Sequence, residues 1–536
     1  MTSIIQNLVG AFKSATPKPV TGEKLKVSSL VGRAAFVYEK IRNAVDYNEE
    51  HLIRKLAISR IMKRKLLFEK VVLENYLLEK HHVDNIAEQL LQELMRAKYF
   101  QGEVPRSLVT EVDTVIQKYI LLINTVKEVE GKINKKMVRF LFEMASVEIE
   151  TVLTPDIKEK ALSRAMFSVM NSRIILPKGL DTEKEKELQL YLACHRSLFK
   201  WDESMIDYLL LTLYYPEWKN ADRELILRIA NNIQKIRAEF EKQKKHPWQK
   251  RMMNILQKKS IIFWVIQDIL DENLDKAGAI FSDKEILESE VKKACQKRYK
   301  GVGVKLRRGV VRSIIYVFFT KMLLAIALEF PMDIFIAGAI NYTSAAINIL
   351  FPPVLMLLVA IMIRLPKKEN TAKILEEVNL ISLGEGDSKI YPLKDPRKRG
   401  KVFKYAFNII FFVTFIGSIM VIFWALNKLD FNFFSSLIFI LFLTLVSFFG
   451  IRIRRPVNDI LAVDRKESFF GAIFAFIAMP WVSLGRFMSV QFGKFNVLAF
   501  VLDFIIEAPF KLLVEIFEDL FSFYREKKED MLQDQS

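Results

Sequence analysis

The spacing of apolar residues divides the chain into two parts of different character. Up to about residue 303, apolar residues recur every three or four positions, as at Ile53, Leu56 and Ile61, which places them on one face of an α-helix. Beyond that point, long apolar stretches alternate with loops rich in lysine and arginine. We find no alternating strand pattern of useful length. The sequence therefore predicts an all-α protein, with a multi-helix cytoplasmic domain followed by a polytopic α-helical membrane domain.

The ends of these parts are also marked in the sequence. Ile5, Leu8 and Phe12 fall on one helical face, so the N-terminus predicts a short helix that docks on the helical domain or, alternatively, lies in the membrane interface. Gly301 and Gly303 are expected to close the helical domain. The predicted segments are an amphipathic N-terminal segment and linker, a helical cytoplasmic domain, a transmembrane domain and a polar C-terminal tail, at residues 1–26, 27–303, 304–524 and 525–536.

The apolar stretches are long enough to cross a bilayer. A spanning helix needs about 20 mostly apolar residues to cross roughly 30 Å of hydrocarbon. Three stretches have this length and no charged residue, and a fourth contains only Lys321 between Ser313 and Leu328. A fifth is short and interrupted by Pro480, and the sixth is expected to be partly interfacial. The expected spans cover approximately residues 311–330, 343–363, 405–427, 431–451, 469–485 and 495–517.

The distribution of basic residues predicts the orientation of these spans. Short cytoplasmic loops collect lysine and arginine. The loop 364–404 holds eleven of them, whereas residues 322–363 hold none. We therefore expect a multi-pass protein with a cytoplasmic N-terminus. A net charge of +18 combined with 51% apolar residues is typical of bacterial inner-membrane proteins, so the expected location is the cell inner (plasma) membrane.

Composition and motifs argue against several classes of function. Only two cysteines occur, Cys194 and Cys295, which excludes a disulfide framework and any metal site built from cysteine. We find no catalytic signature, expect no metal or cofactor, and expect no enzyme. His195 has no ligand-like companion in the sequence and is expected at the surface. Basic and acidic residues are mixed evenly, so nucleic acid is not an expected partner.

The first span carries the most costly residue of the membrane part. Lys321 lies near its middle, where an ammonium group costs several kcal/mol unless it is paired or faces water. Glu329 follows two turns later on the same face, and Asp333 follows Pro331. One hypothesis is a polar pathway with Lys321 inside and the two carboxylates at its outer mouth. The other is a structural ion pair within the bundle.

Two further elements could contribute to an intramembrane polar site. Asn348 and the pair Pro352-Pro353 interrupt the second span, and proline frees backbone carbonyls that need other partners. In the last helix, charged residues recur every four positions and either line a polar interior or lie in the interface. The complete candidate site is Lys321, Glu329, Asp333, Asn348, Asp503, Glu507 and Lys511.

Basic residues directly precede the first span. Each cation near an anionic leaflet contributes about 1 kcal/mol to membrane attraction. The candidate contacts to anionic lipid head groups are Lys305, Arg307, Arg308 and Arg312.

From the sequence we expect a non-enzymatic scaffold or assembly protein in the lipid bilayer, whose helical head engages a protein partner. The alternative is a small-solute or ion transporter or channel that uses the intramembrane charges. An intramembrane enzyme would need a nucleophile paired with a base, and the sequence shows none.

Overall fold

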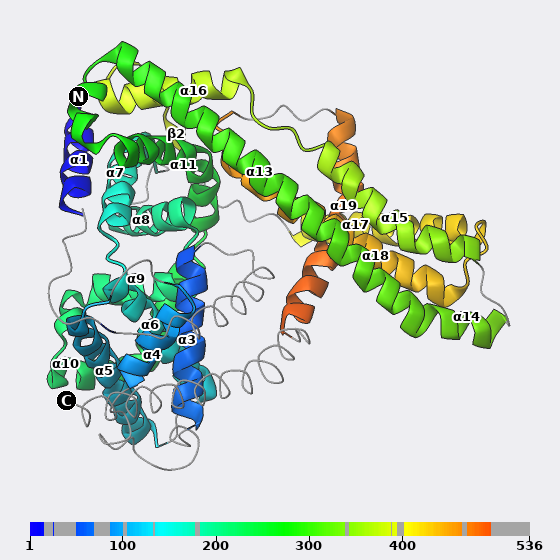
Figure 1. Ribbon diagram of the computed structural model, residues 1–536, viewed down its shortest axis with the longest axis horizontal. Coiled ribbons are helices and arrows are strands. Elements are labelled where there is room, and N and C mark those ends of the chain that lie inside the picture. Colours follow the sequence, from blue (N-terminus) through cyan, green and yellow to red (C-terminus); the bar gives the residue numbers. More distant parts are fainter. Residues whose placement is uncertain are drawn as a thin grey trace, which may run out of the picture. The chain divides into compact units, whose positions relative to one another are not determined.

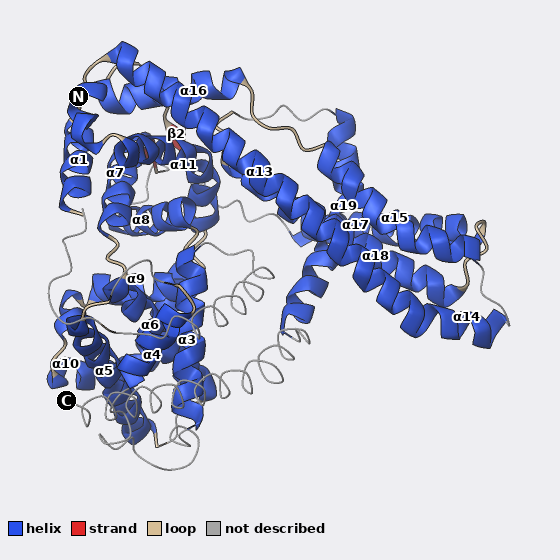
Figure 2. Ribbon diagram, in the orientation of Figure 1, coloured by secondary structure: helices blue, strands red, loops and turns tan. Residues whose placement is uncertain are grey.

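The computed structural model describes most of the chain, and structural statements below refer to this part. It comprises residues 1–15, 25, 50–68, 86–99, 104–131, 134–176, 183–337, 342–386, 388–393, 401–463 and 469–494. Nearly all of these residues are helical, as Figure 2 shows, and the predicted all-α class is confirmed. Besides loops and turns, the described residues include a pair of two-residue parallel strands, β1 (Ile174–Ile175) and β2 (Tyr391–Pro392).

The chain packs into two compact units. The first, called here the helical unit, is formed by Ala11–Phe167 and Thr182–Met253. The second, called the membrane unit, is formed by Met1–Gly10, Ser168–Asp181 and Asn254–Asn496. Residues 254–303, assigned by sequence to the cytoplasmic domain, therefore pack together with the apolar helices.

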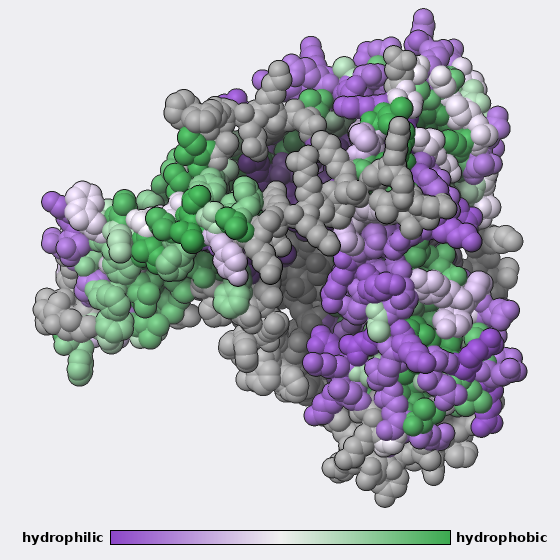
Figure 3. All heavy atoms as spheres, turned by 180° about the vertical axis from the view of Figure 1, so that it is seen from behind, coloured by the Kyte–Doolittle hydropathy of each residue, from purple (hydrophilic) through white to green (hydrophobic). Residues whose placement is uncertain are grey.

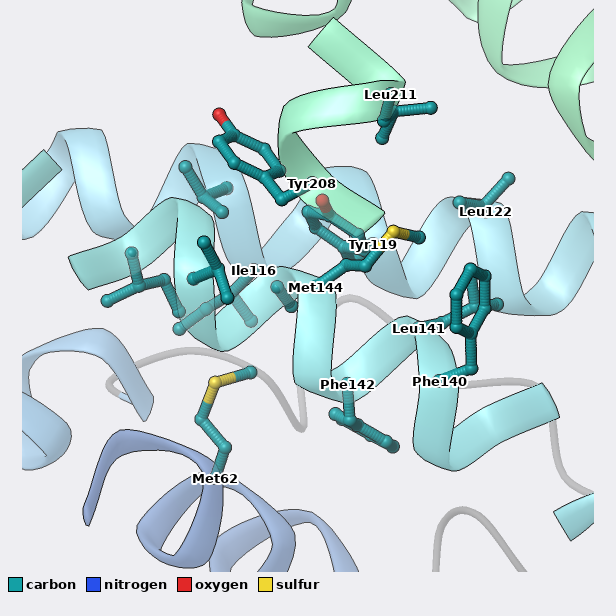
Figure 4. Close-up of a cluster of buried hydrophobic side chains, with 14 of the residues drawn as sticks. Met62, Ile116, Tyr119, Leu122, Phe140, Leu141, Phe142, Met144, Tyr208 and Leu211 are labelled. Carbon is teal, nitrogen blue, oxygen red and sulfur yellow. The ribbon is translucent and has the colours of Figure 1, made fainter. Parts of the chain in front are cut away.

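The helical unit is built around one hydrophobic core. Figure 4 shows part of it, where side chains such as Met62, Ile116, Phe142 and Tyr208 gather from four different helices. Helix starts are fixed locally, since the Asp202 side chain accepts a hydrogen bond from the backbone N–H of Met205. The elements of this unit are α3 (Glu50–Phe68), α4 (Ile86–Arg96), α5 (Arg106–Glu130), α6 (Lys135–Leu153), α8 (Glu183–Phe199), α9 (Glu203–Tyr214), η2 (Pro216–Asn220) and α10 (Arg223–Lys244).

A buried polar network connects η2 to the core of the helical unit. Lys118 Nζ donates to Glu148 Oε1 at 2.5 Å and to the Trp218 carbonyl oxygen at 2.9 Å. The Trp218 ring N–H donates to the other Glu148 oxygen at 2.9 Å. Each charge thus has a partner, which a buried ion pair requires if it is not to destabilise the fold.

The membrane unit contains the apolar helices, which Figure 1 shows lying beside the long helix α13. Helices α1 (Ser3–Ser14), α7 (Ile157–Arg173) and α11 (Gln249–Glu272) each contribute residues to both units. The remaining elements of the membrane unit are η3 (Leu274–Lys276), α12 (Ala277–Ile280), α13 (Lys284–Leu324), the π-helical turn η4 (Ala325–Glu329), α14 (Phe330–Ala337), α15 (Tyr342–Ile361), α16 (Lys368–Leu383), α17 (Lys401–Asn427), α18 (Phe433–Asp459) and α19 (Phe469–Lys494).

Four helical stretches of the described chain are long and apolar enough to cross a membrane. They are Lys284–Met332, Tyr342–Ile361, Tyr405–Asn427 and Phe433–Asp459, and they overlap the first four spans expected from the sequence, with ends that differ by a few residues in the second and fourth. Their surface is apolar, as Figure 3 shows, whereas polar residues cover much of the helical unit. The fifth expected span falls within α19, which is not among the four, and 495–517 lies outside the described residues.

Close contacts fix the directions of these helices. Val359 of α15 lies against Gly450 of α18, and Asn348, earlier in α15, bonds to Ser435, earlier in α18. Early residues of α15 thus contact early residues of α18, and later residues contact later ones, so the two helices run parallel. Leu365 follows α15 and lies at Gly303, near the middle of α13, whereas Asn348, early in α15, bonds to Glu329, just after α13. Helix α13 therefore runs antiparallel to both.

Helix α13 continues without a break from polar to apolar sequence. It has 41 residues, about 60 Å of helix, and the side chain of its N-cap residue Asp283 accepts hydrogen bonds from the backbone N–H groups of Glu285 and Ile286. Gly301 and Gly303, expected to close the helical domain, lie inside α13 and do not end it. A Cβ at Gly303 would come within 3.1 Å of the Leu365 side chain, so this glycine permits a close approach there.

The polar end of the membrane unit is held by buried side chains. The Asn370 amide group donates to the Tyr299 hydroxyl at 2.8 Å and to the Ile460 carbonyl at 2.9 Å, and its oxygen accepts from the Ala462 N–H at 2.7 Å. This one amide joins α13, α16 and the end of α18.

A second buried contact in the same region joins segments far apart in sequence. The carboxylate of Glu377 in α16 forms ion pairs with Arg173 at the end of α7, at 2.8 Å, and with Lys259 in α11. Strand β1 follows Arg173 directly and pairs with β2. The side chain of Thr2, which precedes α1, donates to the Ile381 carbonyl at the end of α16 at 2.6 Å.

The apolar face of α1 is buried by protein. Ile5, Leu8 and Phe12 are almost fully inaccessible. The expected short N-terminal helix is present, and its burial favours docking on the protein over a position in the membrane interface.

Helices α18 and α19 approach most closely at a glycine. A Cβ at Gly485 would lie 2.3 Å from the Thr444 carbonyl oxygen and 2.8 Å from the Phe448 Cβ. Close backbone approach at small residues is a main source of helix association in membranes. Gly417 in α17 has no atom within 4 Å of its Cβ position and serves as a matched control.

We expect Gly485→Ala to destabilise the bundle by about 1–3 kcal/mol, because the added methyl group overlaps backbone that must move. Gly417→Ala should leave stability unchanged or slightly raised. Denaturant titration of both variants in mixed micelles measures the difference. Equal stabilities for the two variants would contradict this packing.

Candidate intramembrane polar site

Lys321 and Glu329 form an ion pair inside the bundle of apolar helices. The ammonium of Lys321 bonds to Glu329 Oε1, and the two side chains are 0% and 1% exposed. Charges this deep cost several kcal/mol in a membrane unless they find partners. Here each charge neutralises the other. Of the two sequence hypotheses for Lys321, the contact has the form of the structural ion pair.

A π-helical turn aligns the two residues. Eight residues of an ideal α-helix make about 2.2 turns, which leaves the first and last about 80° apart around the axis. Residues Ala325–Glu329 instead form a π-turn, in which the Phe330 N–H bonds to the Ala325 carbonyl five residues earlier. A wider turn takes up more residues per revolution, so Glu329 rotates back towards the face of Lys321.

The position of this π-turn follows from the sequence. Pro331 comes directly after it, within α14. Proline has no N–H to donate and its ring clashes with the carbonyl four residues earlier, so it distorts the turn before it. Pro331 therefore accounts for a wide turn at Glu329, and the wide turn accounts for the pairing with Lys321.

Asn348 brings two more helices to the pair. Its side-chain N–H group in α15 donates to Glu329 Oε2 at 2.9 Å and to the Ser435 carbonyl of α18 at 3.3 Å. Because both partners accept hydrogen bonds, the NH2 group must be the end that faces them. Asn348 Oδ1 is buried and has no hydrogen-bond partner within the described chain. The backbone carbonyl of Asn348 also lacks its usual helical donor, since Pro352 stands four residues later.

Apolar side chains close the site. The Lys321 ammonium lies 5.0 Å from the centre of the Phe442 ring, a favourable cation–π position. Phe442 belongs to a small buried cluster with Val317, Met356 and Val446. The charged pair is thus covered by protein, and Asn348 is also 0% exposed.

The structure brings together only part of the predicted site. Lys321, Glu329 and Asn348 meet, as described. Asp333 lies in α14, but its side chain falls outside the described part of the chain. The remaining three predicted members, Asp503, Glu507 and Lys511, lie outside the described residues.

The candidate lipid contacts are all on α13. They are exposed and lie in the stretch of α13 that precedes its apolar half: Lys305, Arg307, Arg308 and Arg312.

Ser435, which takes part in the polar site, was not singled out from sequence. It acts through its backbone carbonyl, which leaves no signature in the residue type.

The helical unit contains a buried histidine where a surface residue was expected. His195 is fully buried, stacks on Trp201 with ring centres 4.3 Å apart, and has Ser163 Oγ at 3.3 Å from its Nδ1. Burial lowers the pKa of His195 to about 3, so the ring is neutral. The surface expectation is wrong because His195 follows Tyr191 and Leu192 at helical spacing, which places it on the core face.

This histidine does not form an accessible catalytic site. Ser163 and His195 are both fully inaccessible, and burial raises the pKa of the adjacent Cys194 thiol well above its usual range. Within the residues that the structure describes, no group of three histidine, cysteine or acidic side chains has metal-binding geometry.

Comparison with known proteins identifies no relative: no family model, no curated protein and no solved structure matches this chain. Its function must therefore be inferred from the arrangement of its own residues.

We expect Lys321→Met and Glu329→Gln, made singly, to destabilise the bundle by about 3–5 kcal/mol each, because each leaves an unpaired buried charge. The double variant should recover most of this loss, since no charge remains. Denaturant titration in mixed micelles gives the four free energies of the cycle. Lys428→Met, which removes an exposed cation, is the control and should have little effect. Additive losses in the double variant would rule out a direct pair.

A pH effect is expected from Glu159 in α7. Burial, and secondarily the charge of Asp156, raise its pKa from 4.5 to about 7. The folded state then binds a proton more tightly than the unfolded state, so stability falls as pH rises from about 4.5 to about 7 and levels off above. Glu159→Gln should reduce this fall and raise stability at pH 8 by roughly 2–3 kcal/mol.

Thermal unfolding of the full chain in detergent at pH 5 and pH 8 tests this effect. Glu224→Gln, at an exposed position of α10, is the matched control. Burial also raises the pKa values of Glu150 and Asp207 to about 6, so part of the fall of stability with rising pH remains in every variant. An unchanged slope in Glu159→Gln would exclude Glu159 as a source.

Proposed function

We propose that the chain is a non-enzymatic, multi-pass membrane protein of the scaffold or assembly type. It anchors a helical domain at the cytoplasmic face of a bacterial inner membrane, where that domain engages a protein partner. The observation that carries this proposal is the closed state of the intramembrane charges. Lys321 and Asn348 both bond to Glu329, and these contacts connect three helices, as in an anchor. They do not line a path for a solute.

The exposed aromatic residues support a transmembrane position for these helices. Tyr405 and Trp424 of α17 are 68% and 66% exposed. They stand 19 residues apart, about 28 Å along the helix, which matches the roughly 30 Å of bilayer hydrocarbon. Tyrosine and tryptophan are enriched at the two membrane interfaces. Lys428 adds a cation 5.6 Å from the Trp424 ring at the same end.

Helix directions support one common cytoplasmic end. Exposed cations precede the apolar half of α13, which runs antiparallel to α15 and α18. Exposed Arg364 follows α15, and exposed Arg452, Arg454 and Arg455 lie near the end of α18. The cations of all three helices thus lie at one end of the bundle, in agreement with the positive-inside rule. On this basis the N-terminal part is cytoplasmic.

The continuity of α13 supports an anchoring role. This helix packs against α16 in its polar half and against α15 and α18 in its apolar half. An unbroken helix transmits position more rigidly than a flexible linker would. The membrane helices and the polar end of the unit therefore move together, which suits a scaffold.

The helical unit supports binding of a protein rather than catalysis or nucleic acid. Its most deeply buried ion pair, Lys118 with Glu148, is enclosed by protein and satisfied. Its charges are of mixed sign, whereas nucleic-acid binding favours a continuous basic stripe. The proposal requires no cofactor.

A transporter or channel is the second candidate. One observation favours it: Asn348 Oδ1 is a buried acceptor without a partner in the described chain, beside a π-turn, and such turns are frequent at functional sites. A solute or proton that binds there would have to displace the Lys321–Glu329 contact.

The charge-neutral double variant Lys321→Met/Glu329→Gln separates the two candidates. If the protein is a scaffold, the variant should restore the phenotype of a deletion strain as well as the native chain does. Proteoliposomes loaded with a pH-sensitive dye should show no proton flux with either chain. Failure of the variant to complement, at normal expression and stability, or a flux that requires the native pair, would reject the scaffold and support transport.

A further inference from the structure

One face of α13 changes from basic to apolar along its length. Lys305, Arg308, Arg312, Tyr316 and Phe319 follow at spacings of three or four residues, which places them on a single helical stripe. All five side chains are exposed. The first three are cations, the fourth is an amphipathic aromatic residue and the fifth is apolar. The whole sequence of changes occupies 14 residue steps, about 21 Å of helix.

The neighbouring helix α18 changes character at the same level. Tyr316 meets Phe449 of α18 edge to face, with ring centres 6.2 Å apart. The two helices run antiparallel, so one turn before Tyr316 on α13 corresponds to one turn after Phe449 on α18. Arg312 occupies the first position, and Arg452 stands three residues after Phe449. Exposed cations of two packed helices therefore lie at one height along the bundle.

We propose that this surface binds an anionic phospholipid. The phosphate lies at Arg312 and Arg308, with Lys305 and Arg452 close by, and an acyl chain lies along Tyr316 and Phe319. Guanidinium groups suit phosphate because they present paired donors in a planar fork. Tyrosine fits between the two zones, since its ring is apolar and its hydroxyl is polar. The inference rests on the proposed membrane insertion and adds a defined lipid partner to it.

The order of residues identifies a lipid rather than another phosphate compound. Free phosphate or nucleic acid would be attracted by the cations alone. Neither would gain from the exposed apolar side chains of Tyr316 and Phe319, which follow Arg312 on the same face of α13. A phospholipid carries both chemistries in this order, with its charge outside and its chains inside.

The test compares two matched triple variants of the full chain in a neutral detergent. The first, Lys305→Gln/Arg308→Gln/Arg312→Gln, removes the three cations of the stripe and is called the stripe variant. Arg223→Gln/Arg228→Gln/Lys235→Gln removes the same number and types of exposed cations from α10. Dioleoyl phosphatidylglycerol is titrated into each protein, and the apparent affinity is read from the rise in Tm.

We expect the stripe variant to bind roughly 100-fold more weakly than the native chain, about fivefold for each cation lost. The α10 variant should bind as the native chain does. High salt should weaken native binding, because the contact is electrostatic. Phe319→Ala should weaken binding of the lipid and leave any effect of inorganic phosphate unchanged.

Equal affinities of the stripe variant and the α10 variant would overturn the proposal. So would equal binding of dioleoyl phosphatidylcholine, or an effect of inorganic phosphate as large as that of the anionic lipid. Membrane insertion, measured separately by resistance to alkaline extraction, distinguishes the failures. A chain that inserts but does not select the anionic lipid rejects only the lipid site, whereas a chain that does not insert rejects the proposed function itself.

Discussion

A lysine and a glutamate that neutralise each other among apolar helices set the arrangement of the membrane bundle. An isolated charge at this depth is too costly to keep, so Lys321 and Glu329 must stay together whenever the bundle is folded. Their contact requires the π-turn between them and excludes a straight continuation of α13 into α14. Asn348 then ties the same carboxylate to α15 and, through Ser435, to α18. Three helices are thereby held in one register by polar contacts, in a region where apolar surfaces alone would not specify it.

Close packing reinforces this register away from the charges. Gly450 admits Val359 of α15, and Gly485 admits the backbone of α18 at Thr444. In lipid the hydrophobic effect does not drive apolar side chains together, so van der Waals packing and hydrogen bonds between helices decide which helices associate. In the same unit, Asn370 holds the polar half of α13 to α16 and to the end of α18 with buried hydrogen bonds, and Glu377 ties α16 to α7 and α11. Polar side chains thus fix both halves of one long helix, and glycine contacts fix neighbouring helices between them.

The helical unit follows a different rule. Its core is a conventional apolar one, and the buried Lys118, Glu148 and Trp218 satisfy one another within the unit. Buried groups such as His195 and Cys194 have pKa values shifted by burial towards their neutral forms. His195 and Cys194 therefore stay neutral within the folded core.

The sequence alone determined the helical class, four of the apolar helices and the identity of the costly residue Lys321. These follow from periodicity and from runs of uncharged residues, which are local properties of the chain. An ion pair within the bundle was one of two hypotheses from the sequence, and the contact of Lys321 with Glu329 depends on the wide turn that precedes Pro331, a feature of backbone geometry. The roles of Ser435 and Phe442, the burial of His195 and the passage of α13 through Gly301 and Gly303 depend on which helices meet. Only the tertiary structure decides that, because burial and pairing are properties of contacts between distant segments rather than of residue types.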